Sequence, residues 1–108
     1  MSSSQQPLYW DSASQALAAT TAYKVNLPPG TTDWTVVNGS GGTIGIAGTA
    51  ATIASPHLAV LNNTVFNGKG GELYLANATG APLTVVVSWI RPGRQPTGDA
   101  GATTFTAL

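Results

Sequence analysis

The feature that most constrains the fold is the run Leu83–Ile90, LTVVVSWI, the longest unbroken stretch of β-forming residues in the sequence. β-Branched and aromatic side chains pack well on a pleated surface. Because side chains alternate between the faces of a strand, one face of this run is wholly apolar: Leu83, Val85, Val87 and Trp89. Pro82 and Pro92 cannot donate to a β-ladder and therefore bracket the run. We predict a central strand whose apolar face covers a core.

Further β-forming runs, separated by turn signals and without convincing helical amphipathicity, indicate an all-β chain. Short strands with a turn about every eight to twelve residues are typical of sandwiches and barrels. The predicted fold class is a single antiparallel β-sandwich or jelly-roll-like barrel with extended N- and C-terminal arms. The other expected strands are 22–27, 33–38, 43–48, 49–55, 57–61 and 72–77.

Two connections are predicted to be hairpin turns. Asn38-Gly39 is a strong hairpin signal because both residues tolerate positive φ. Residues 43–48 are therefore expected to return beside 33–38. By the same reasoning, the turn that ends in Gly80-Ala81-Pro82 is expected to pair 72–77 with the central strand.

The two ends are predicted to be arms, which divides the chain into arm 1–15, domain 16–91 and arm 92–108. The first arm contains an apolar cluster, Leu8-Tyr9-Trp10. We expect this cluster to dock, either on the protein's own domain or on a neighbouring subunit. The second arm could reach about 55 Å at ~3.3 Å per residue, further than a small domain is wide. It can fold back along its own sheet or add a strand to a neighbour, and we favour the neighbour. The candidate interaction residues are Leu8, Tyr9, Trp10, Phe105 and Leu108.

Charge is unusually scarce, at 7% of residues and a net charge of zero, against about 25% charged residues in ordinary soluble domains. A small free-standing protein usually needs charge to avoid self-association, so this composition favours a surface that partners cover. The alternative is a secreted β-protein with a polar, uncharged surface. The scattered basic residues do not form the cluster that binding to nucleic acid requires. We also expect no membrane span and no signal peptide, because no apolar run is long enough and the N-terminus is polar.

No catalytic, cofactor or metal site is predicted. The chain has no cysteine, which removes disulfides and thiolate ligands. His57 is the only histidine, and a Ser-His-Asp set would need the fold to bring Asp11, Asp33 or Asp99 beside it. A calcium site at Asp33 and Asn38 is a weaker interpretation than a hairpin there. The three Asn-x-Ser/Thr sequences are interpreted as turns, and Trp10 is the best surface aromatic for stacking on a sugar.

Residues 31–48 and 71–90 have a distinctive order: a strand, an Asn-Gly break, a glycine-studded strand and a late hairpin. They read TTDWTVVNGSGGTIGIAG and GELYLANATGAPLTVVVSWI. With the terminal arms, this pattern resembles small β-sandwich virion proteins of tailed bacteriophages, of the capsid decoration or cement type. The resemblance implies a non-enzymatic, many-copy virion protein, assembled in the host cytoplasm and bound to the major capsid protein or another virion protein. It also implies a homo-oligomer, with a trimer as one candidate, and no cofactor. The alternatives are a head–neck or tail subunit, a carbohydrate-binding module and, last, a small hydrolase.

Overall fold

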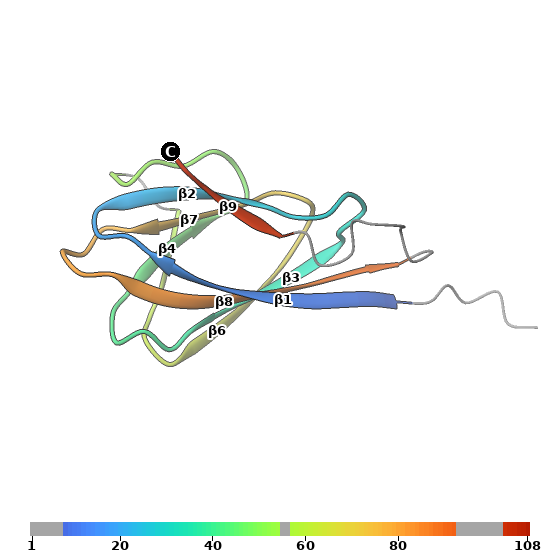
Figure 1. The fold of residues 1–108 in the computed structure, drawn as a ribbon, viewed down its shortest axis with the longest axis horizontal. Helices are drawn as coiled ribbons and strands as arrows, with labels where there is room; N and C mark the ends of the chain where they lie inside the picture. Colours follow the sequence, from blue (N-terminus) through green and yellow to red (C-terminus); the bar gives the residue numbers. More distant parts are fainter. Residues whose placement is uncertain (1–7, 55–56, 93–102) are drawn as a thin grey trace, which may run out of the picture.

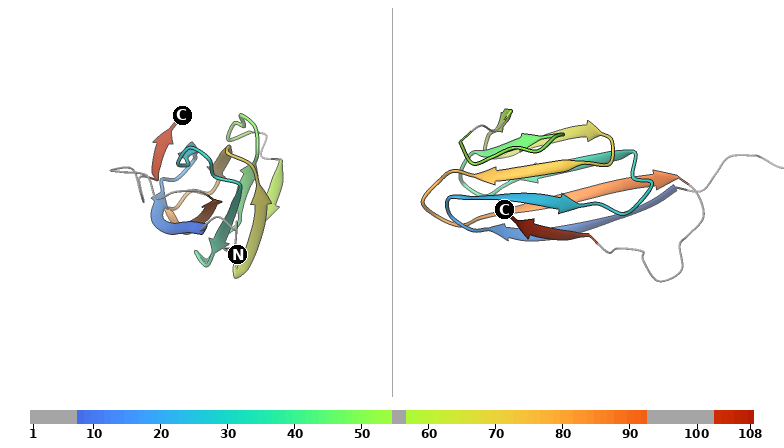
Figure 2. Two further views of the ribbon diagram at one scale, coloured as in Figure 1. Left: turned by 90° about the vertical axis from the view of Figure 1, so that its right-hand side faces the viewer. Right: turned by 90° about the horizontal axis from the view of Figure 1, so that it is seen from above.

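The computed structural model describes residues 8–54, 57–92 and 103–108, and for residues 8, 9 and 92 the backbone alone. The described residues form two antiparallel sheets that pack face to face (Figure 1, Figure 2). Sheet A has the order β1-β8-β3-β6 and sheet B the order β5-β4-β7-β2-β9. The predicted β-sandwich is therefore confirmed. The strands are β1 (Leu8–Leu17), β2 (Thr21–Asn26), β3 (Asp33–Asn38), β4 (Ile44–Ala47), β5 (Leu58–Val60), β6 (Thr64–Lys69), β7 (Leu73–Asn77), β8 (Leu83–Pro92) and β9 (Thr104–Ala107).

Strand β8 is the central strand that the sequence predicts. It pairs with β1 along its whole length, from Leu8↔Pro92 to Leu17↔Leu83, and with β3 on its other side. Its predicted apolar face is buried against sheet B. The core contains Leu17, Tyr23, Val25, Trp34, Val36, Ile44, Ile46, Val60, Leu73, Leu75, Leu83, Val85, Val87 and Trp89.

Both predicted hairpins are wrong. Strand β3 lies in sheet A and β4 in sheet B, while β7 lies in sheet B and β8 in sheet A. Each connection therefore carries the chain from one sheet to the other. Of the links between successive strands, only β4 to β5 stays within a sheet.

A buried asparagine holds each of these two corners. The Asn38 amide nitrogen donates to the carbonyls of Gly42 (2.7 Å) and Val60 (2.8 Å), and its carbonyl oxygen accepts from the Ser40 hydroxyl (2.6 Å). Val60 belongs to β5 of sheet B, so the side chain ties the end of β3 to the opposite sheet. A tight hairpin would leave no room for this contact.

Asn77 repeats the arrangement at the end of β7. Its amide nitrogen donates to the carbonyls of Leu17 (3.0 Å) and Ala81 (2.8 Å), and its carbonyl oxygen accepts from the Thr79 hydroxyl (2.6 Å). Both asparagines are fully buried. These two Asn-x-Ser/Thr sequences therefore lie where a strand ends and the chain passes to the other sheet.

The structure also corrects the predicted arms. Residues 8–15 are part of β1 in sheet A, and β9 pairs with β2 of the same chain, from Tyr23↔Ala107 to Asn26↔Thr104. Phe105 packs against the core from β9, and the Leu108 N–H donates to the Ala22 carbonyl (2.9 Å). The predicted docking of the second arm on a neighbour is therefore wrong for residues 103–108. Strand β9 instead pairs with β2 of the same chain, where Phe105 packs against the core. The rest of the predicted arms, 1–7 and 93–102, lies outside the described residues.

Residues 49–54, expected to begin a strand, form a loop instead. Ala51, Thr52 and Ile53 share a hollow with Ala22 of β2 and with Leu108. Figure 1 shows this segment in green along the outer side of sheet B. Strands β4 and β7 are buried on both faces, although an open hollow lies over Gly45, Ala59 and Ala76.

We expect Asn77→Ala to lower the free energy of unfolding by about 3 kcal/mol, because several buried backbone groups lose their partner. Asn38→Ala should have a similar effect. Asn67→Ala is the matched control. Asn67 is exposed, and its side chain accepts a hydrogen bond from the Thr35 hydroxyl at the protein surface. Urea denaturation would measure the three values, and equal stability of all three variants would contradict the role of the corners.

Candidate functional site

The outer face of sheet A is the open face of the sandwich. The strand registers place its side chains in rows that run across the four strands. Four large apolar side chains on this face are solvent-exposed: Trp10 (75%), Val65 (56%), Ile90 (40%) and Val37 (37%). A row of polar side chains separates the row of Trp10 and Ile90 from the row of Val37 and Val65. The rows are Trp10, Ile90, Asp33 and Lys69; then Ser12, Ser88, Thr35 and Asn67; then Ser14, Val86, Val37 and Val65.

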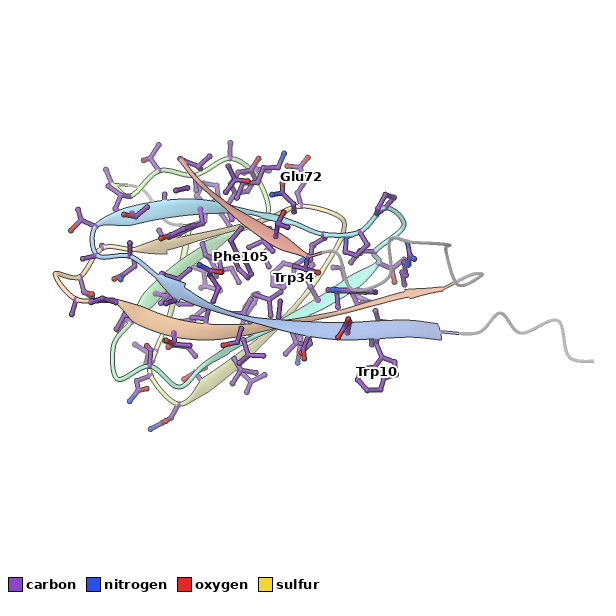
Figure 3. All side chains as sticks on the ribbon, viewed as in Figure 1. Trp10, Trp34, Glu72 and Phe105 are labelled. Carbon is purple, nitrogen blue, oxygen red and sulfur yellow. The ribbon has the colours of Figure 1, made fainter. Side chains whose placement is uncertain are left out.

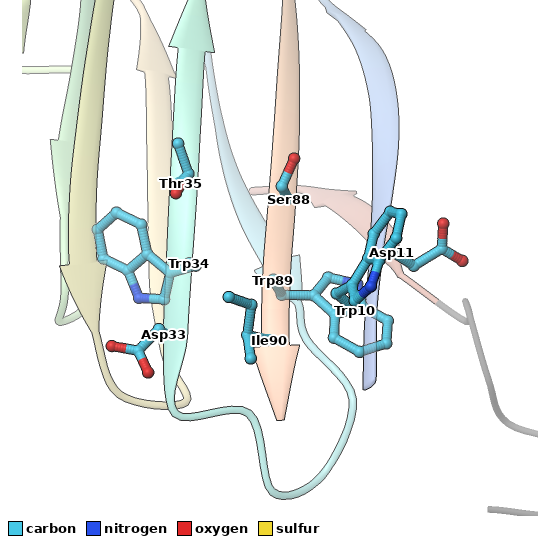
Figure 4. Close-up of a pocket in the computed structure, with 8 residues that line it drawn as sticks. All are labelled: Trp10, Asp11, Asp33, Trp34, Thr35, Ser88, Trp89 and Ile90. Carbon is cyan, nitrogen blue, oxygen red and sulfur yellow. The ribbon is translucent and has the colours of Figure 1, made fainter. Parts of the chain in front are cut away.

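The row of Trp10 borders an open hollow of about 180 Å³ (Figure 4). Trp10 comes from β1, Ile90 and Ser88 from β8, and Asp33 and Thr35 from β3. Trp10 projects away from the body of the protein, whereas Trp34 and Phe105 lie between the sheets (Figure 3). The hollow therefore combines one exposed aromatic ring with hydroxyl groups and the carboxylates of Asp11 and Asp33.

One of the two carboxylates, that of Asp33, is held in its charged form. A hydrogen bond from the Lys69 ammonium (3.0 Å) and one from the Thr32 hydroxyl (2.9 Å) lower the pKa of Asp33 below its ordinary value. In the next row, the Thr35 hydroxyl donates to the Asn67 side chain (2.7 Å). The Asp33 carboxylate can therefore accept hydrogen bonds from a partner or ligand without first losing a proton.

The alternative site residues are not brought together. His57 lies in a second open hollow with Leu58, Phe66 and Gly68, whereas Asp11 and Asp33 line the hollow beside Trp10. Asp99 lies outside the described residues. Asp33 and Asn38 stand at opposite ends of β3, and Asn38 holds a corner. Within 8–54, 57–92 and 103–108, no group of three His, Asp or Glu residues could hold a metal ion.

The five predicted interaction residues lie on different parts of the surface. Leu8 and Tyr9 take part in β1 by their backbones, opposite Pro92 and Arg91. Trp10 is exposed on the outer face of sheet A, whereas Phe105 is half-buried and Leu108 is exposed beside sheet B. The exposed large apolar residues not singled out from the sequence are Val37, Val65 and Ile90 on the outer face of sheet A, and Leu58 and Leu61 elsewhere. Alternation along 33–38 and 83–90 places Val37 and Ile90 opposite the core residues, but it does not tell which outer face stays open.

Comparison with known proteins gives no relative: no family model matches the chain, and neither does a curated protein or a solved structure. Among the described residues, no helix is long and apolar enough to cross a membrane.

We expect Gly68→Ala to lower the free energy of unfolding by about 1–3 kcal/mol, the usual cost of overpacking. Gly68 lies opposite Trp34 in the β3–β6 ladder, and a Cβ there would overlap the Trp34 ring. Gly80→Ala is the control, because a Cβ at Gly80 meets nothing within 4 Å. Thermal unfolding of both variants would measure the difference, and equal melting temperatures would contradict this packing.

Proposed function

We propose that the protein is a non-enzymatic structural subunit of a bacteriophage virion, of the capsid decoration or cement type. In this proposal the outer face of sheet A binds the major capsid protein or another virion protein, and nucleic acid and membranes play no part. The chain would be assembled in the host cytoplasm and work as part of a homo-oligomer. The observation that carries the proposal is the contrast between the two outer faces.

The outer side of sheet B carries a loop of the chain itself and exposes Leu108 beside it, whereas sheet A exposes four large apolar side chains, Trp10, Val37, Val65 and Ile90. Large exposed apolar patches mark interaction sites in soluble proteins. Four strands about 4.8 Å apart, with ~3.3 Å per residue, give this face a plan area of roughly 500 Å². Each partner in a standard protein interface contributes about 800 Å². One such face is therefore a substantial part of an interface with a protein partner.

The scarcity of charge supports the same proposal. Apart from Asp33 and Lys69, which pair with each other, the three rows of this face contain no charged side chain. The cores of protein interfaces are depleted of charged residues, because burying an unpaired charge is costly. This face can be covered without leaving such a charge.

We expect Val65→Lys to fold normally and to be lost from purified particles, because a buried lysine without a partner weakens the contact. The control is Thr52→Lys, which adds the same charge to the loop over sheet B. Mass spectrometry of virions, produced from a phage that lacks the gene and is supplied with each variant, measures incorporation. Normal incorporation of Val65→Lys, or absence of the wild-type protein from virions, would refute the proposal.

A carbohydrate-binding module is the second candidate, and one observation favours it. Trp10 is mostly exposed beside Ser88, Thr35 and the ionised Asp33. Sugar rings stack on exposed aromatic faces, and their hydroxyl groups bond to such polar groups. A head–neck or tail subunit would use the same outer face and differs only in its location in the virion.

For the second candidate, Trp10→Ala should abolish retention on a polysaccharide column, whereas Trp10→Phe should keep a large part of it because a ring remains. The melting temperature should stay close to that of the wild type, since Trp10 lies outside the core. Equal retention of Trp10→Ala and wild type, or no retention of either, excludes this function.

A further inference from the structure

The four edges of the two sheets are not alike. Edge strands β5, β6 and β9 contain 3, 6 and 4 residues, whereas β1 contains 10. Natural sheets protect their edges with short strands, lysine, proline or bulges, because an open edge can pair with another chain. Strand β6 contains Gly68 and ends at Lys69.

Strand β1 lacks the short length, the lysine, the proline and the bulge, and Asp11 is its one charged side chain. Its pairing with β8 runs from Leu8↔Pro92 to Leu17↔Leu83 without a bulge. Its sequence, LYWDSASQAL, contains no lysine, arginine, proline or glycine, and the middle is made of small side chains. Among the described residues no strand pairs with its other side, so it is a long and regular edge that a second strand can approach closely.

The main-chain groups of β1 that do not bond to β8 can be placed by residue parity. The Ser12 N–H donates to the Asp11 carboxylate (2.8 Å), and the Ala16 carbonyl accepts from the Gln15 amide (3.1 Å). In an antiparallel pair, the backbone N–H and C=O groups of alternate residues bond to the neighbouring strand. The N–H and C=O groups of the residues between them point away from that strand. The even-numbered residues therefore present their N–H and C=O groups to the open side.

We propose that β1 pairs with β1 of a second copy of this chain, antiparallel and around a two-fold axis at Ala13. This joins two four-stranded sheets into one continuous sheet, and the contact is of the isologous kind that closes on itself. It goes beyond the proposed function, because it needs no capsid partner.

Side-chain complementarity favours this register over axes at Asp11 and Ser12. With the axis at Ala13, the exposed Trp10 lies opposite Ala16, a large side chain beside a small one. Asp11 lies opposite Gln15, whose amide can donate to the carboxylate. An axis at Asp11 would instead place two carboxylates opposite each other, and an axis at Ser12 would place Asp11 opposite Ala13, which cannot bond to it.

A single cysteine tests the contact, because the chain contains no other. At the axis the two Ala13 residues form a non-hydrogen-bonded pair with Cα atoms about 4.5 Å apart, within the range that a disulfide spans. Ala13→Cys should therefore become a covalent dimer under mild oxidation. Thr84→Cys, on the exposed face of β8, should stay monomeric on a non-reducing gel.

Analytical ultracentrifugation gives the independent measurement. The wild type should sediment as a dimer, and Ser14→Pro as a folded monomer of half that mass, because Ser14 is one of the residues that point away from β8. A monomeric or trimeric wild type would overturn the proposal. Faster cross-linking of Ser12→Cys or Thr84→Cys than of Ala13→Cys would overturn the register.

Discussion

The architecture depends on two buried asparagine side chains that turn the chain between the sheets. Asn38 and Asn77 each satisfy backbone carbonyls with the amide nitrogen, while the carbonyl oxygen holds the following Ser40 or Thr79. Buried backbone groups without partners are costly, so a corner of this kind is stable only when a side chain supplies the missing bonds. These two residues let successive strands enter opposite sheets, and this alternation gives β8 its neighbours β1 and β3.

The sequence predicts the strands far better than their partners. Alternation along 83–90 identifies the central strand and its buried face, because periodicity reports local geometry and burial together. The two predicted hairpins fail because Asn38-Gly39 and the residues after Asn77 favour a change of direction without fixing the sheet that the chain enters next. Nothing local distinguishes a hairpin from a corner here, since the deciding contacts are with Val60 and Leu17, far away in the sequence.

At the candidate site too, features set by neighbouring residues in the sequence were predictable, and features set by distant contacts were not. Trp10, the aromatic that the sequence favours for the surface, is exposed, and the burial of Trp89 follows from its valine neighbours. Val37 and Val65 could not be assigned to an exposed patch, because their environment depends on which sheet the loop 48–54 covers. The same limit applies to the termini: an apolar Phe105 indicates docking, but the free edge of β2 that receives it exists only in the folded protein.

The pairing of the first strand with the eighth has a consequence for how the protein folds. Leu8 meets Pro92 and Tyr23 meets Ala107, so both sheets are completed by residues from opposite ends of the chain. Such contacts lose loop entropy before they gain stability, which makes folding slow compared with helical proteins. During synthesis, β1 must wait for most of the polypeptide to leave the ribosome before its partner exists. Until then its apolar residues and unpaired backbone remain accessible to chaperones and to other nascent chains.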